Sequence, residues 1–116
     1  MVIAARLRRS DEIAMVRAEG VSLGDRFFGA RMKAGAGDSL RLSVSSQRAV
    51  GSAVRRNRAR RRVREALRLA LQVHPNELPP VDLVVSVRRP ALDAPPEALQ
   101  AAARRVVAAI AGAVRP

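Results

Sequence analysis

The residues that could do chemistry are concentrated in one stretch, residues 50–68, which reads VGSAVRRNRARRRVREALR. Eight of these nineteen residues are arginines, and one asparagine, Asn57, lies between two of them. A guanidinium group is planar, permanently charged and bidentate toward phosphate, and an amide adds directional hydrogen bonds. The stretch therefore has the chemistry to bind a polyanion through its phosphates.

The other residues do not supply the groups that catalysis or metal binding needs. The chain has no cysteine and one histidine, His74, which excludes thiolate metal sites and ordinary zinc sites. Its ten carboxylates are scattered, and only Asp11 and Glu12 are adjacent, so no two-metal site is expected. Gly35 and Gly37 lack the lysine of a phosphate-binding loop and indicate a turn. We therefore expect no catalytic residue and no metal ligand in the protein.

The composition is that of one small, strongly basic domain. A chain of 116 residues can form a single core, which must be built from Val, Leu, Ala and Ile because there are two Phe and no Trp or Tyr. Twenty-two basic residues, 21 of them arginine, against ten acidic ones give a net charge of +12, which implies a polyanionic partner. No segment has the pattern of a signal peptide or the length of a membrane span, so we expect a cytoplasmic protein.

The basic stretch is predicted to be a helix that starts at the N-cap Ser52 and runs to about Val73. Its apolar residues form one stripe: Ala59, Val63, Ala66, Leu67 and Ala70. The opposite face carries a row made of Asn57, Arg61, Arg64 and Arg68, and a second row made of Arg55, Arg58 and Arg62. Arg56 and Arg60 point toward the margin of the sheet. The apolar stripe ties this segment to the core, so it is not a disordered tail.

Like charges at these spacings oppose helix formation, and a bound polyanion would neutralise them. Anionic lipid is a poor candidate, because the apolar face of the helix belongs to the core and has no aromatic anchor. DNA binding by a helix-turn-helix is disfavoured by the strands on either side of the helix. RNA fits the pattern better than either of these.

The remaining elements place this helix in an α+β domain that spans residues 1–116. A helix over residues 10–19 turns Ile13, Val16 and Met15 toward the core, and a short strand is expected near residues 21–23. A strand over residues 26–33 alternates between Phe28, Ala30 and Met32 on the inner face and Phe27, Gly29 and Arg31 on a wet face. It is expected to form an antiparallel hairpin with a strand over residues 40–46. Residues 81–87 predict a strand buried on both sides, and a final helix opens after Asp93. The core face of that helix comprises Leu99, Ala103, Val106, Val107, Ile110 and Val114.

The segment AVRRNRARRRVREALR resembles the signature of the protein subunit of bacterial ribonuclease P, named for its Arg-Asn-Arg core, here Arg56, Asn57 and Arg58. Four further segments resemble the family in the same order and with compatible spacing: RLRRSDEIAMVRAEG, DRFFGARM, LRLSVSSQRAVGSAV and DLVVSVRRPA. Together they cover nearly the whole chain.

The resemblance implies a fold and a function. The fold is a compact domain similar to domain two of the small-subunit ribosomal protein S5, ordered α-β-β-β-α-β-α, whose arginine helix joins two parallel strands by a left-handed crossover. The function is to bind the catalytic RNA subunit of ribonuclease P and to help it remove the 5′ leader of precursor tRNA. In this family the RNA performs hydrolysis with bound Mg²⁺, so the protein alone is expected to be inactive.

The resemblance also implies two sets of site residues. The set that contacts the RNA subunit comprises Arg48, Arg55, Arg56, Asn57, Arg58, Arg60, Arg61, Arg64 and Arg68. The set in a cleft for the single-stranded leader comprises Ile13, Arg17, Phe27, Phe28, Arg31 and Arg60. Three of the four aromatic positions of that cleft are non-aromatic here, which leaves base stacking to arginine side chains. Strand parity leaves open whether Phe27 or Phe28 faces the cleft.

Two other functions fit the residues less fully. One is a structural protein of the ribosome with the same fold, which would bind ribosomal RNA without taking part in processing. The other is a DNA-binding protein that uses the basic helix. The precursor tRNA and the RNA subunit of ribonuclease P are the partners that we expect, with neither DNA nor a membrane among them.

Overall fold

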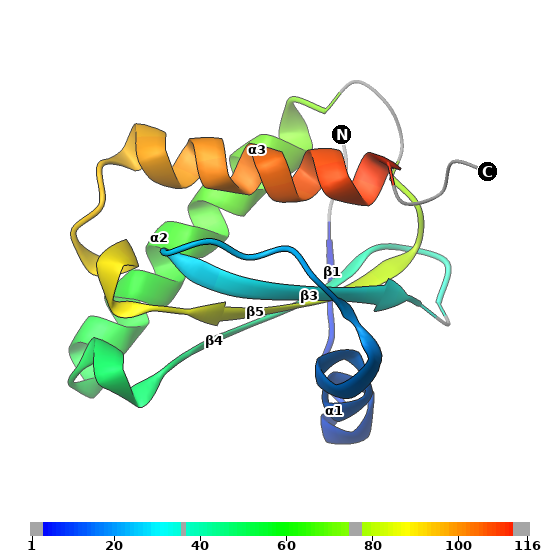
Figure 1. Cartoon of the computed structure of the whole chain (residues 1–116), viewed down its shortest axis with the longest axis horizontal. Coiled ribbons are helices and arrows are strands. Elements are labelled where there is room, and N and C mark those ends of the chain that lie inside the picture. The colour runs from blue at the N-terminus through cyan, green and yellow to red at the C-terminus, as the bar shows by residue number, and fades with distance from the viewer. Residues whose placement is uncertain (1–3, 36, 75–77, 113–116) are drawn as a thin grey trace.

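The computed structural model describes residues 4–35, 37–74 and 78–112, and Figure 1 shows the arrangement of its helices and strands. The elements are β1 (Ala5–Arg6), α1 (Ser10–Glu19), β2 (Val21–Ser22), β3 (Phe28–Ala34), β4 (Arg41–Ser46), α2 (Ala53–Gln72), β5 (Val81–Val87) and α3 (Pro96–Gly112). Two short 3-10 helices, η1 (Arg48–Val50) and η2 (Arg89–Leu92), follow β4 and β5. The α+β class and the order of the predicted elements are confirmed, and β1 is an additional strand that precedes α1.

The strands form one mixed sheet in the order β1-β4-β5-β3-β2. β4 is parallel to both β1 and β5, whereas β3 is antiparallel to β5 and to β2. The predicted hairpin between β3 and β4 is therefore wrong, because β5 lies between them. A strand that is apolar on both faces is most stable at the centre of a sheet, and a turn signal alone does not select the partner of a strand. The α2 helix consequently connects two parallel neighbours, β4 and β5, as the resemblance implies; the handedness of this crossover stays a prediction.

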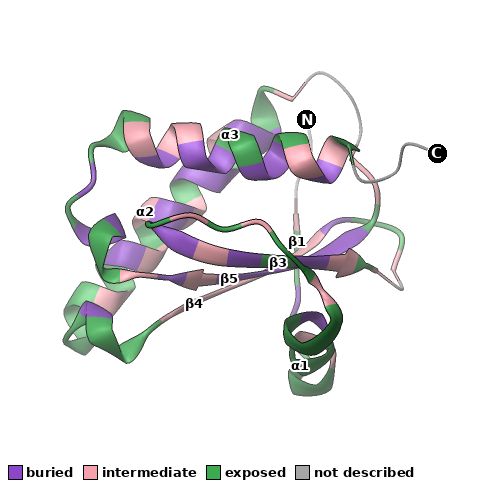
Figure 2. Cartoon of the chain, in the orientation of Figure 1, coloured by how far each residue is buried: buried purple, intermediate pink, exposed green. Residues whose placement is uncertain are grey.

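The helices cover the two faces of the sheet unequally. α2 and α3 lie on one face and α1 on the other (Figure 1). The main core lies between the sheet and α2 and α3, where Phe28, Val85 and Ile110 are fully buried. A smaller cluster under α1 contains Leu7, Val16 and Val84. Figure 2 shows that the helix faces turned toward the sheet are buried, while most of α1 is exposed.

The alternation predicted for this strand is confirmed from Phe28 onward, whereas the wet-face position predicted for Phe27 is wrong, because β3 begins at Phe28 and Phe27 is buried. Phe28, Ala30 and Met32 are buried on the α2 and α3 side, and Arg31 is exposed on the α1 side.

In α1, Val16 is buried and Ile13 is partly buried, but Met15 is half exposed, so its predicted place in the core is wrong. Met15 instead borders a surface pocket together with Lys33 and Ala34 of β3.

α2 follows its sequence pattern closely. The side chain of Ser52 accepts a hydrogen bond from the backbone N–H of Arg55 at 3.3 Å, which makes Ser52 the N-cap as predicted. Gly51, immediately before it, has a φ of 125°, a conformation that favours glycine and turns the chain from η1 into the helix. All five predicted stripe residues of α2 are buried. The predicted core face of α3 is likewise confirmed up to Ile110, and Val114 lies outside the described residues.

α1 is held against the sheet by a charged side chain. Arg41, on β4, makes a bidentate pair with Asp82 on β5, with Nε–Oδ1 and Nη2–Oδ2 distances of 2.8 and 2.7 Å. The same guanidinium reaches Glu12 on α1 at 2.7 Å. These hydrogen bonds raise the pKa of Arg41, that to Asp82 contributing most. Asp82 is buried, so its charge requires this partner.

Candidate nucleic-acid interface

The exposed face of α2 carries more positive charge than the chain neutralises. Within the part of the chain that the structure describes, Arg68 is the one arginine of α2 that forms an ion pair, with Glu65 at 2.5 Å. That hydrogen bond lowers the pKa of Glu65 and raises the pKa of Arg68. The predicted RNA-binding residues of α2 are exposed or half-buried: Arg55, Arg56, Asn57, Arg58, Arg60, Arg61, Arg64 and Arg68. The helix therefore presents a basic surface that the described residues leave largely without counter-charge.

Asn57 orients a neighbouring arginine. Its Oδ1 accepts a hydrogen bond at 3.2 Å from Arg60, and Arg60 also donates to the hydroxyl of Ser46, at the end of β4, at 3.0 Å. The Asn57 oxygen is thus engaged within the protein, and its NH₂ group is what remains for a ligand. Arg60 points to the margin of the sheet, as predicted.

A third element contributes to this basic surface. Arg6 on β1 is in register with Leu42, whose side chain packs on the α2 side of the sheet, so Arg6 faces α2 as well. Burial, followed by the charges of Arg6 and Arg60, lowers the pKa of Arg64. Three guanidinium groups therefore lie near one another at this edge of the sheet. Sequence reasoning missed Arg6, because nothing local indicates that a two-residue strand pairs with β4.

The side chain of Arg62 is held by hydrogen bonds to the protein backbone and is not free on the surface of α2. Its guanidinium donates to the carbonyl oxygens of Ala91 at 2.6 Å and Leu92 at 2.8 Å, and to that of Ala94. These carbonyls belong to η2 and to the segment that leads into α3. Arg62 therefore joins α2 to α3 and is not part of the exposed second row in which the sequence placed it.

A second basic surface lies on the α1 side of the sheet. It contains a cavity of about 320 Å³, whose lining includes Arg17 from α1, Arg31 from β3 and Arg88, which follows β5. Val84 and Ser86 of β5 also line it. Arg31 donates to the carbonyl of residue 20 at 3.1 Å, which fixes the end of its side chain. The structure thus brings together two of the three arginines predicted for the leader cleft, Arg17 and Arg31.

Arg88 is an addition to that set. Val84, Ser86 and Arg88 are alternate residues along β5 and its continuation, so their side chains are expected on the same face of the sheet. This alternation could have identified Arg88 from the sequence. Its guanidinium lies across Gly29, where an added Cβ would be 3.1 Å from Arg88 Nη2. The absence of a side chain at Gly29 therefore lets the guanidinium lie flat on the sheet.

The other predicted cleft residues lie elsewhere. Phe28 is fully buried in the main core and Phe27 is 7% exposed, so neither ring faces the cavity. Phe27 precedes β3, so the alternation of that strand does not determine where its ring points. The backbone N–H of Phe27 donates a hydrogen bond to Asp25. The Arg26 guanidinium lies 4.9 Å from the centroid of the Phe27 ring. Because the chain has no other Phe and no Trp or Tyr, any base stacking in the cavity must use guanidinium groups.

Two more residues that were predicted for the leader cleft, Ile13 and Arg60, lie outside the cavity. Ile13 packs against the small cluster under α1 and does not line the cavity. Arg60 bonds Ser46, whose neighbours in register place it on the α2 side, so Arg60 belongs to the first surface and not to the second. Arg48, in η1, is exposed at the entry to α2.

The described ranges contain no cluster of three or more His, Cys, Asp or Glu side chains that could hold a metal ion. Over the same ranges, no helix has both the length and the apolar character needed to cross a membrane. What the structure offers is two arginine-rich surfaces on opposite faces of one sheet.

These features define a class: a small basic α+β protein with an arginine-rich helix between two parallel strands. Solved structures of this fold include the RNase P protein of Staphylococcus aureus, with a TM-score of 0.73 and 24% identity over 94% of this chain and 99% of that one. The RNase P protein from Thermotoga maritima has a TM-score of 0.73 and 27% identity over 90% of this chain and 96% of that one.

The chain belongs to the Ribonuclease P family, whose model matches residues 1–111. The ribonuclease P protein component of Chloroflexus aggregans is 39% identical over 99 residues, which cover 84% of this chain and 71% of that protein. That of Chloroflexus aurantiacus is 41% identical over 98 residues, covering 84% and 70%. Membership of the family was predicted from the sequence and is confirmed.

Proposed function

We propose that the protein binds the RNA subunit of ribonuclease P through the exposed face of α2 and the 5′ leader of precursor tRNA through the cavity beside α1. The observation that carries this proposal is the set of α2 arginines that lack a carboxylate partner in the described ranges. Such a face gains free energy from phosphates, because each neutralised phosphate releases a condensed counterion. Arg48 at the entry to α2 extends this face, and Arg6 extends it onto β1.

The leader site is assigned to Arg17, Arg31 and Arg88. A single-stranded leader offers phosphates and unstacked bases, and guanidinium groups bind the first and stack on the second. Because this cavity and α2 lie on opposite faces of the sheet, the protein can hold the RNA subunit and the substrate at the same time (Figure 1).

The hydrolytic step is assigned to the RNA. Under this proposal the Mg²⁺ ions of the reaction are bound mainly by the RNA subunit, which agrees with the lack of a cluster of three or more metal-binding side chains among the described residues. The residues of the protein contribute charge neutralisation, which brings two polyanions together, and placement of the leader relative to the RNA subunit.

Reconstitution tests this function. The protein is mixed with a bacterial ribonuclease P RNA at low Mg²⁺ and near-physiological salt, and cleavage of a precursor tRNA is followed. We expect the protein to stimulate cleavage at the mature 5′ end and to be inactive without the RNA. Absence of stimulation with a cognate RNA subunit would overturn the proposal and favour one of the other RNA- or DNA-binding functions.

A further inference from the structure

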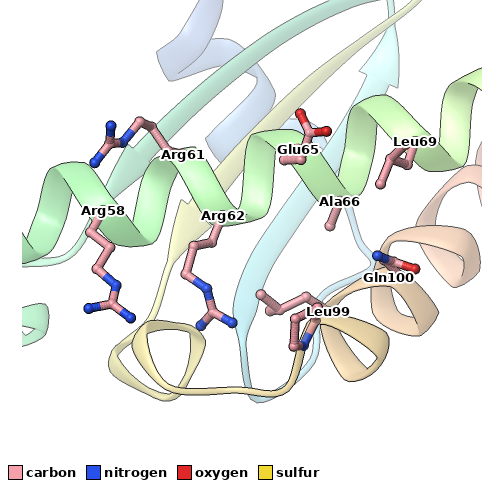
Figure 3. Close-up of a pocket in the computed structure, with 9 residues that line it drawn as sticks. Arg58, Arg61, Arg62, Glu65, Ala66, Leu69, Leu99 and Gln100 are labelled. Carbon is pink, nitrogen blue, oxygen red and sulfur yellow. The ribbon is translucent and has the colours of Figure 1, made fainter.

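A groove of about 360 Å³ lies between α2 and the start of α3, beside the basic surface and separate from the leader cavity. Its apolar lining comprises Ala66, Leu69, Pro96 and Leu99. Arg58 and Arg61 border it from α2, and Gln100 borders it from α3. Figure 3 shows Arg58 and Arg62 extending from α2 toward the segment that leads into α3. Binding sites for small groups have this composition, with apolar walls and a few polar groups.

The polar groups of the groove divide into fixed and available ones. The guanidinium of Arg62 donates its hydrogen bonds to backbone carbonyls of residues 91, 92 and 94, so its planar face is what it offers to a ligand. Glu65 is paired with Arg68. By contrast, the side chains of Arg58, Arg61 and Gln100 make no hydrogen bond or ion pair within residues 4–35, 37–74 and 78–112.

The shape of the groove is set before any ligand binds. Arg62 fastens η2 and the start of α3 to α2, and Leu99, which is 2% exposed, packs into the core beneath it. A preformed site loses less conformational entropy on binding than one that must be assembled.

We propose that this groove binds an unpaired nucleobase of RNA. The flat faces of a base match the apolar lining and the plane of Arg62, and the Gln100 amide can donate to and accept from its hydrogen-bonding edge. The phosphate of the same nucleotide contacts Arg58, and Arg61, which Figure 3 shows extending from the other side of α2, contacts a phosphate further along the strand. Arg61 belongs both to the groove and to the exposed row of α2, so an RNA strand bound on that row passes the mouth of the groove.

This inference rests on the proposed function, because it treats α2 as an RNA-binding helix. It adds a contact that depends on the base, whereas phosphate contacts are independent of sequence. An acidic peptide is the other occupant whose charge would suit Arg58 and Arg61. It has no flat apolar group to match the lining, so the nucleobase is favoured.

Nuclear magnetic resonance of the whole, ¹⁵N-labelled protein tests the groove. The probes are AMP, GMP, CMP and UMP, with ribose 5-phosphate as the probe that lacks a base. We expect at least one nucleotide to shift the amide signals of Leu69 and Gln100, and ribose 5-phosphate to leave them in place. Equal shifts from ribose 5-phosphate would show a phosphate site only, and shifts from a tetra-aspartate peptide alone would show a peptide site. Either result, or no shift at all, overturns the proposal.

A substitution gives a second readout. Gln100→Ala is expected to weaken binding of that nucleotide roughly fivefold, since one hydrogen bond to the base can no longer form, and to leave binding of ribose 5-phosphate unchanged. Gln47→Ala, an exposed glutamine outside the groove, is the matched control and should change neither. Equal affinity of the Gln100→Ala and Gln47→Ala variants for the nucleotide would contradict a base contact at Gln100.

The reconstituted enzyme separates this inference from the proposed function. If the protein stimulates cleavage but no nucleotide shifts the groove signals, the nucleobase site is wrong and the function stands. If nucleotides bind in the groove but the protein does not stimulate precursor tRNA cleavage by a ribonuclease P RNA, the protein is an RNA-binding protein of another kind.

Discussion

At the scale of single residues, Asn57 and Arg60 act as a pair. The amide oxygen holds the guanidinium at 3.2 Å, and Ser46 holds its other end at 3.0 Å. A long arginine side chain loses rotational freedom when it binds a ligand, and a side chain already fixed by two hydrogen bonds loses less. Asn57 therefore lowers the entropy that Arg60 would lose on binding the proposed RNA ligand, and its own NH₂ group stays available.

The unpaired arginines on the exposed face of α2 should determine the salt dependence of RNA binding. Replacing Arg56 and Arg58 by alanine is expected to weaken binding to the RNA subunit and to reduce the slope of log K against log salt by about 1.8, that is about 0.9 for each phosphate that the variant no longer neutralises. Filter binding or fluorescence anisotropy at several salt concentrations measures the slope. Arg104→Ala, which removes an exposed arginine from α3, serves as the control. An unchanged slope in the double variant would show that these residues do not bind phosphates.

Arg31 is expected to contribute to the affinity for precursor tRNA but not to the affinity for mature tRNA. Its replacement by alanine is expected to lower the affinity of the reconstituted enzyme for precursor tRNA about tenfold, as for removal of a charge-assisted hydrogen bond, and to leave mature tRNA binding unchanged. Arg26→Ala, an exposed arginine outside the cavity, is the matched control. Equal losses of affinity for precursor and mature tRNA would place Arg31 outside the leader site.

At the scale of elements, adjacent residues of α2 have different tasks. Arg61 lies on the exposed face, whereas Arg62 binds the carbonyl groups before α3. One helix thus presents unpaired arginines on one side and organises its own domain with the other. The division follows from the helical period, which turns successive side chains by about 100°.

The pair Arg61 and Arg62 allows a matched test. Arg62→Ala leaves backbone carbonyls without their charged donor, so we expect the free energy of unfolding to fall by about 1.5–3 kcal/mol. Arg61→Ala should change it by less than about 0.5 kcal/mol, as for other surface positions, while weakening RNA binding. Urea unfolding followed by circular dichroism measures both. Equal stability of the two variants would contradict the structural role of Arg62.

The N-cap of α2 offers a second test at this scale. Ser52→Ala removes the acceptor for the N–H of residue 55 and is expected to cost about 1 kcal/mol of stability. Ser10, the first residue of α1, makes no capping bond, so Ser10→Ala should be close to neutral. Comparison of the two urea midpoints checks this, and a neutral Ser52→Ala would mean that the cap does not stabilise α2.

At the scale of the whole molecule, the sheet separates two basic surfaces and Arg41 fixes α1 beside one of them. The guanidinium spans β4, β5 and α1 through Asp82 and Glu12. Without it, the buried carboxylate of Asp82 would lack its cation, which is a costly arrangement. The position of α1, and with it the cavity lined by Arg17 and Arg31, therefore depends on this one side chain.

Replacing Arg41 by methionine should lower Tm and speed amide hydrogen exchange in α1. Methionine keeps much of the volume but leaves Glu12 and Asp82 without their cation. Lys33→Met is the control, because its ion pair with Glu19 is longer, at 3.6 Å, and more exposed. Calorimetry and hydrogen exchange give the comparison, and equal effects of the two variants would show that Arg41 does not hold α1.

The sequence by itself determined whatever depends on local periodicity. The apolar stripe and cap of α2, the inward side of β3 and the burial of β5 are all set by residues a few positions apart, and the structure has them as predicted. The family membership was also visible, because the Arg-Asn-Arg segment and four others stand in order along the chain.

Only the tertiary structure decided what depends on distant segments. It placed β5 between β3 and β4, brought Arg6 to Arg64, and turned Arg62 from a member of an exposed row into a tie to α3. It also buried Phe27, which the predicted alternation had placed on the wet face, because β3 begins one residue later, at Phe28. Periodicity specifies which side of an element is apolar, but not which element it meets, because that depends on how the whole chain fills one core.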